Sequence, residues 1–203
     1  SDMYHVLQRC AILVSRMALT MPPPMFHDMV RATASWPDLC RRLISTSATL
    51  SHARSRKLVA LGLAHMLRHA SAQDKGLLSA VPDMIGMWTE VVGEVVEDEA
   101  GSADRYEREL SPTRALEIGE DGIPFLDEFG LIEAAPTPSS ARTDAVRSRD
   151  PSFNVPLRAY VADTLNAVLQ NGSYKTQLQS LLATIDPLVL DTLQRGLSER
   201  PVA

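Results

Sequence analysis

His65 and His69 are a histidine pair whose spacing could support metal chemistry. They stand four residues apart, and this spacing places two imidazoles on one face of a helix, where they can hold a metal ion. The metalloprotease pattern also needs a glutamate after the first histidine, but Met66 occupies that position, and no third ligand lies nearby in the sequence. A helical metal-dependent hydrolase is therefore one hypothesis. The alternative is that His65 lines a helix interface and His69 ends a helix, where a cation is favourable.

Other catalytic signatures are missing from the sequence. It has no nucleophile elbow, no glycine loop for phosphates and no dinucleotide-binding fingerprint. Carboxylates are abundant, but they fall in a polar run where nothing would separate their pKa values into an acid and a base. We therefore predict that the chain is not an enzyme, with no catalytic residue, no metal site and no cofactor.

The acidic side chains are concentrated in one stretch. Between Glu90 and Glu133 there are fourteen acids and three bases, a net charge of −11 in a chain whose total is −5. An acidic surface attracts basic proteins by long-range steering that weakens with salt. We predict that the partner-binding residues of this surface are Glu94, Glu97, Asp98, Glu99, Asp104, Glu107, Glu109, Glu120, Asp121, Asp127 and Glu128.

Two alternatives to this binding role remain open. The acidic stretch could regulate the protein from within the chain, or it could be a solvated insertion that keeps the protein soluble. The basic run of Arg54, Arg56 and Lys57 lacks interleaved aromatics, so we predict no nucleic-acid partner. We expect Arg56 and Lys57 to contact acids of the preceding repeat.

Composition favours an all-α protein. The 203 residues are 45% hydrophobic and only 5% aromatic, and the dominant leucine, alanine and methionine favour helices over strands. Cys10 and Cys40 lie in apolar helical patterns, which is typical of buried free thiols in a reducing compartment. No apolar run approaches the roughly 20 residues of a membrane span, so no membrane partner is expected.

Apolar periodicity predicts the helices. In the first half they cover 4–19, a stretch from Met25, a short stretch that begins after Trp36-Pro37, 54–69, and a stretch whose first turn holds Pro82. Asn171-Gly172 and Asp186-Pro187 then separate three helices after Pro156. The first helix should bury a broad face made of Val6, Leu7, Cys10, Ile12, Leu13, Val14 and Met17.

Stacked antiparallel helix hairpins are the fold that these elements predict, an α-solenoid of the HEAT type. Residues 1–99 should form two to three hairpins, 100–155 an acidic linker or insertion rich in proline, glycine and serine, and 156–203 a three-helix cap. Trp36 and Trp88 should pack in the core between hairpins. The methionines at Met17, Met21, Met25 and Met29 should fill core gaps.

Two blocks of sequence resemble the C-terminal HEAT repeats of the importin-β (karyopherin) family, and the importin-eleven-like receptors in particular. One block is Arg56-Lys57-Leu58-Val59-Ala60-Leu61-Gly62-Leu63, flanked by Trp36 and Trp88; the other leads from Asp150-Pro151 through Leu181-Leu182 to Ile185-Asp186-Pro187. The resemblance implies a C-terminal piece of a longer nuclear transport receptor. Such a receptor would carry basic protein cargo through the nuclear pore, shuttle between cytoplasm and nucleus, and release cargo when Ran-GTP binds.

The resemblance does not assign a Ran site to this chain. Ran-GTP would bind through N-terminal repeats that are absent here, and nucleoporins are further candidate partners. A second hypothesis is a HEAT scaffold that joins subunits of another complex, of the phosphatase-regulator sort. That scaffold would use ridge and turn residues near Asp38 and Asp83 and would show weak salt dependence.

Overall fold

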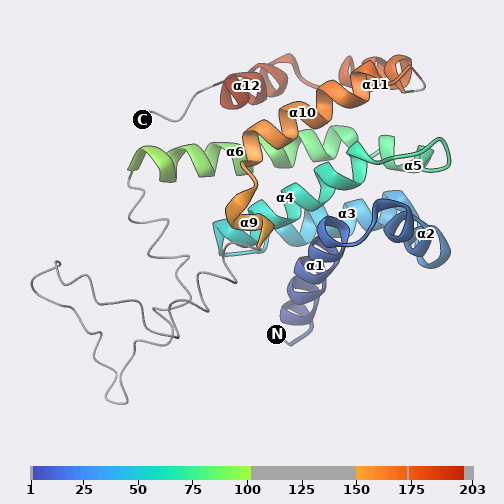
Figure 1. The fold of residues 1–203 in the computed structure, drawn as a ribbon. Helices are drawn as coiled ribbons and strands as arrows, with labels where there is room; N and C mark the ends of the chain where they lie inside the picture. The colour runs from blue at the N-terminus through green and yellow to red at the C-terminus, as the bar shows by residue number, and fades with distance from the viewer. Residues whose placement is uncertain (1, 102–149, 173, 199–203) are drawn as a thin grey trace, which may run out of the picture.

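The computed structural model describes residues 2–101, 150–172 and 174–198, and every regular element in these ranges is a helix. The helices form two layers of a stacked arrangement (Figure 1). Their bounds are α1 Asp2–Thr20, α2 Pro23–Thr33, α3 Trp36–Ser47, α4 Ala53–Arg68, α5 Lys75–Leu78, α6 Val81–Gly101, α9 Pro151–Asn154, α10 Leu157–Gln170, α11 Lys175–Leu182 and α12 Pro187–Ser198.

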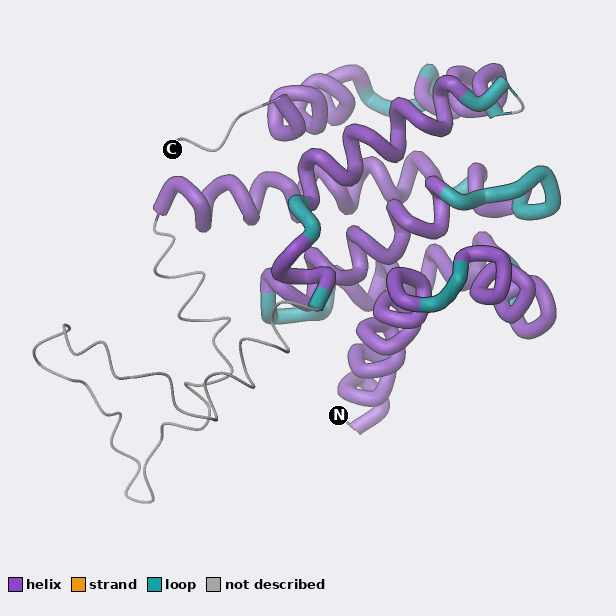
Figure 2. The backbone as a smooth tube through the Cα atoms, in the orientation of Figure 1, coloured by secondary structure: helices purple, strands orange, loops and turns teal. Residues whose placement is uncertain are grey.

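Helices α1, α4 and α10 make one layer, with α4 in the middle. Helices α3, α6 and α12 make the other layer, with α6 in the middle, and each pairs with its partner across the layers. The hairpins α1–α3, α4–α6 and α10–α12 therefore stack in chain order, and the short loops between the helices lie at the ends of the hairpins (Figure 2). This is the α-solenoid expected from the sequence.

The core lies between the two middle helices. α4 is buried on nearly all sides from Lys57 to Leu67, and α6 buries the stripe that contains Ile85, Trp88 and Val92. Trp88 is wholly buried and donates its indole N–H to the carbonyl of Ala60 at 3.1 Å. Trp36 is 5% exposed. The prediction that both tryptophans pack in the core is confirmed.

The buried face of α1 differs from the prediction. Ala11, Ser15 and Ala18 are buried, whereas Val6, Leu7, Cys10 and Leu13 are exposed. The rest of the predicted face, Ile12, Val14 and Met17, is half-buried and packs on the core. Of the two cysteines, only Cys40 is buried as expected. The reason for the changed face is close packing on α4, because a Cβ added at Gly62 would lie 2.9 Å from the Cβ of Ser15. Only small side chains fit at such a crossing, so the larger ones point away from it.

Helix starts agree with the cap signals, with one correction. The third helix was predicted to begin after Trp36-Pro37, but these two residues open α3. The Ser35 hydroxyl caps this helix by accepting from the Asp38 amide, and proline suits a first turn. α6 begins beside Pro82, and Asp186 caps α12 by accepting from the Leu188 amide at 2.8 Å. The four-residue helices α5 and α9 were not predicted.

Candidate partner-binding face

The exposed face of α6 is the part of the acidic stretch that the structure describes. Glu90 and Glu94 lie there, with side chains 66% and 37% exposed. The backbone of α6 continues through Glu97, Asp98 and Glu99, whose side chains lie outside the described part. The predicted residues Asp104, Glu107, Glu109, Glu120, Asp121, Asp127 and Glu128 also lie outside the described residues.

Arg56 of α4 sits between the two described glutamates. Its guanidinium forms an ion pair with Glu90 at 3.0 Å and another with Glu94. Both partners follow Arg56 in the chain, so the expectation that Arg56 contacts acids of the preceding repeat is wrong. One cation thus serves two carboxylates, and the face keeps a net negative charge.

Asp83 adds a third carboxylate to this face, about two turns before Glu90. It lies in the first turn of α6, where the helix dipole favours an acid, and it is exposed. No ion pair or hydrogen bond joins its carboxylate to another described side chain. Asp83 was predicted to make contacts only under the scaffold hypothesis, although its spacing from Glu90 places both on one side of the helix.

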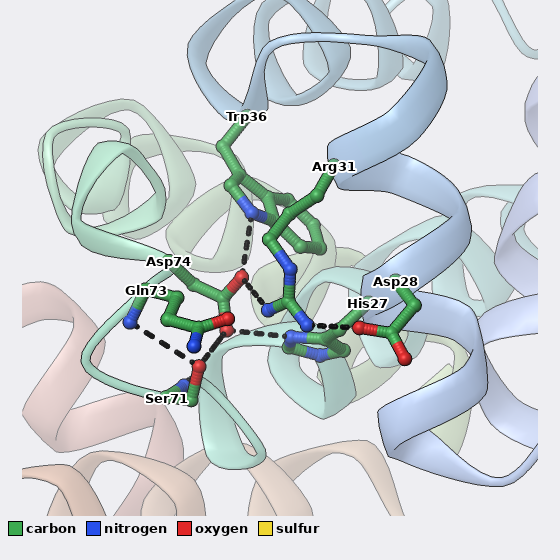
Figure 3. A network of polar contacts seen from close by, with 7 residues as sticks. All are labelled: His27, Asp28, Arg31, Trp36, Ser71, Gln73 and Asp74. Carbon is green, nitrogen blue, oxygen red and sulfur yellow. Dashed lines mark hydrogen bonds and ion pairs between the residues drawn. The ribbon is translucent and has the colours of Figure 1, made fainter.

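Asp74 lies in a buried polar network that the sequence analysis missed (Figure 3). Its carboxylate is fully buried and accepts hydrogen bonds from Arg31 at 2.7 Å, Trp36 at 2.9 Å and His27 Nδ1 at 3.0 Å. The backbone amide and hydroxyl of Ser71 donate at 2.8 and 2.7 Å. An ionised carboxylate only accepts, so His27 is the donor in this hydrogen bond, through Nδ1.

The Asp74 network joins three parts of the fold, because its carboxylate accepts five hydrogen bonds from them. Burial alone would raise the pKa of Asp74, but the hydrogen bonds from Ser71, His27 and Arg31 outweigh it and hold the pKa well below its usual range. The carboxylate therefore stays ionised and joins α2, α3 and the loop before α5. The spacing of Ser71 and Asp74 is the only local signal in the sequence that could have indicated it.

Asp150 plays a similar role where the described chain resumes. It caps α9 through the Ser152 amide at 3.0 Å and binds Arg16 of α1 at 2.8 Å and Arg54 of α4 at 2.5 Å. Burial alone would raise the pKa of Asp150, but the hydrogen bonds from Ser152 and Arg16 lower it to about 2. Arg54, which belongs to the basic run for which no nucleic-acid partner was predicted, thus pairs with a carboxylate inside the protein.

The histidine pair lies at the contact of α4 and α10. The Nδ1 atom of His65 is 2.5 Å from the hydroxyl of Tyr160, and its ring centre is 4.4 Å from that of His69, which caps α4. Burial and the nearby His69 lower the pKa of His65 to about 4. His65 lines a helix interface as expected, and within the described ranges no three His, Cys, Asp or Glu side chains are grouped to hold a metal ion.

The fold and this face define an α-solenoid repeat protein with an acidic outer helix. A family model described as "Importin-11-like, TPR repeats" matches residues 2–198, so the chain belongs to the importin-11-like family of nuclear transport receptors. That is a family of carriers and not of enzymes. The comparisons with curated proteins and with solved structures gave no match.

The family description names TPR repeats, whereas the sequence analysis expected HEAT repeats. Both are stacked helix hairpins. The first helices of the first two hairpins, α1 and α4, begin 51 residues apart at Asp2 and Ala53, which is nearer the HEAT period of about 40–47 than the TPR period of 34 residues. No helix in the described ranges is both long and apolar enough to cross a bilayer.

Proposed function

We propose that this chain binds basic protein cargo through the acidic face of α6 and the acidic stretch that follows it, as part of a nuclear import receptor. The observation that carries the proposal is the excess of carboxylates on that face, where Asp83, Glu90 and Glu94 have Arg56 as their only described cationic partner. Family membership supports a transport role, and cargo binding at this place is our inference.

The mechanism is binding and release, without a chemical step. Exposed carboxylates attract lysine- and arginine-rich surfaces over distances near the Debye length, about 8 Å at physiological salt. Such steering raises the association rate more than it lengthens the bound state. Shuttling between cytoplasm and nucleus belongs to the same proposal, whereas Ran-GTP binding is not proposed for these repeats.

The test is fluorescence anisotropy of a labelled lysine- and arginine-rich peptide with the full chain, at low and at physiological salt. The comparison variant neutralises Glu97, Asp98, Glu99 and Asp104 to glutamine or asparagine, and the control probe replaces the basic residues of the peptide with glutamine. We expect salt-sensitive binding that the variant weakens and the control probe lacks.

Two results would contradict the proposal. The absence of binding at either salt would leave the acidic stretch as a solubilising or regulatory insertion. Binding that neither salt nor neutralisation changes would favour the scaffold hypothesis, in which ridge residues such as Asp38 make the contacts.

A further inference from the structure

The exposed face of α6 carries glycines as well as acids. Asp83, Gly86, Glu90 and Gly93 follow one another at spacings of three, four and three residues, so they share one side of the helix. The opposite side is the buried stripe with Trp88. Positions along this side of α6 therefore alternate between a carboxylate and a residue with no side chain.

Packing does not explain these glycines. A Cβ added at Gly86 or Gly93 would meet no atom within 4 Å, in contrast to Gly62, where it would clash with Ser15. A glycine inside a helix costs about 1 kcal/mol relative to alanine. Glycine is also the residue used where a ligand must approach the backbone closely.

A hollow of about 430 Å³ lies beside Gly86, between α3 and α6. Its apolar walls are Ile44 of α3, Ala48 just after α3, and Pro82 and Met87 of α6. Asp83 and Glu90 also line it. Arg41 is the one cation among its lining residues, and its guanidinium is 2.8 Å from a carboxylate oxygen of Asp38.

The chemistry of the hollow matches one kind of side chain. Lysine and arginine have long apolar stems and a cationic tip, so they suit a site with aliphatic walls and carboxylates at its edge. Another hollow, of about 520 Å³ between α10 and α12, has no charged lining residue among those described and offers no such match. A nucleic-acid or membrane phosphate would be repelled by Asp83 and Glu90.

We infer that the hollow between α3 and α6 receives a lysine or arginine side chain of a basic protein partner, with the partner's backbone lying against α6 over Gly86 and Gly93. The inference rests on the proposed function and adds the place and the contact mode. The acids supply attraction at long range, and the hollow with its open glycines supplies the close fit.

The test fills the hollow without removing a charge. The Gly86→Leu variant adds a side chain where the structure has open space, and leucine favours the helix. Gly172→Leu is the matched control, because Gly172 is exposed between α10 and α11 and also has no atom near its Cβ position. Urea unfolding of all three proteins verifies that the fold is retained.

Binding of the labelled basic peptide is then measured by anisotropy with the full chain. We expect Gly86→Leu to weaken binding by at least about tenfold, a cost of about 1.4 kcal/mol, and Gly172→Leu to bind like wild type. Asp83→Asn, which leaves the hollow open, should weaken binding less and reduce its dependence on salt.

The outcomes separate this inference from the proposed function. If wild type binds, the neutralised variant does not, and Gly86→Leu binds like wild type, the hollow is not the contact although the acidic surface is. If wild type itself does not bind the basic peptide, the proposed function fails and this inference fails with it.

Discussion

The Asp74 network and the exposed face of α6 put the same chemical group to opposite uses. Asp74 is fully buried and has five donors, so its charge is satisfied inside the protein. On α6, Glu90 and Glu94 share Arg56, and Asp83 has no described partner. A carboxylate surrounded by donors inside the protein stabilises the fold, whereas the exposed carboxylates of α6 stay accessible to a partner.

Removal of the buried Asp74 carboxylate should cause the greatest loss of stability. Asp74→Ala should destabilise the fold by about 3–5 kcal/mol, because Arg31, His27 and Trp36 lose their shared acceptor inside the protein. Urea unfolding followed by circular dichroism measures the loss. Asp28→Ala is the control, because Asp28 also pairs with Arg31 but is 72% exposed; an equal loss in both variants would refute the central role of Asp74.

Asp150 should show an intermediate effect that depends on pH. Asp150→Ala should cost about 1–3 kcal/mol, since the buried acceptor is lost but Arg16 can still reach water. The pKa of Asp150 is about 2 in the folded protein and about 4 in an unfolded chain. The lowered folded-state pKa means that the stabilisation is complete above about pH 4 and is lost as the pH falls towards 2.

The measurement is the difference in unfolding free energy between wild type and Asp150→Asn across that pH range. The difference should shrink as the pH falls, because protonation makes the wild-type carboxyl resemble the amide. A difference that stays constant with pH would show that the carboxylate charge is not what Arg16 and Arg54 hold.

Glycine-to-alanine substitutions should change stability in opposite directions on open and on packed helix surfaces. Gly86→Ala should stabilise the protein by up to about 1 kcal/mol through helix propensity. Gly62→Ala should destabilise it, because the new methyl would press on Ser15. Thermal unfolding of both variants reports the two signs, and a destabilised Gly86→Ala would show that the space beside α6 is not open.

The smallest expected effect on stability belongs to the exposed acids. Glu90→Gln should change the unfolding free energy by about 0.2–1 kcal/mol at most, because Glu90 is 66% exposed and Arg56 retains its ion pair with Glu94. Denaturant unfolding at low and high salt measures it. A loss comparable to that of Asp74→Ala would place Glu90 among the structural acids and remove it from the binding face.

Local signals in the sequence predicted the long helices and missed the long-range polar contacts. Apolar periodicity and proline positions located α4, α6 and α12, because burial on one or more faces repeats along a helix. No periodicity reveals that His27, Arg31 and Trp36 converge on Asp74, since those residues meet only after α2 and α3 have folded against the loop. The prediction for the buried face of α1 was wrong at several positions, because alanine and serine at a close helix crossing contribute little to a hydrophobicity pattern.

The candidate face was predictable only in part. The charge count indicated an acidic surface, and Glu94 was among the predicted partner-binding residues. The sequence could not show that Arg56 would fold between Glu90 and Glu94, nor that Gly86 would border a hollow formed with α3. The contribution of the remaining predicted acids stays a prediction.

The contacts of Asp150 have a consequence for how fast the chain folds. Asp150 binds Arg16 and Arg54, which are 134 and 96 positions away in the sequence, and α10 packs on α4. Contacts between residues far apart in the sequence slow folding, because the chain loses entropy before they can form. The third hairpin should therefore join the stack later than the first two, whose contacts lie closer in the sequence.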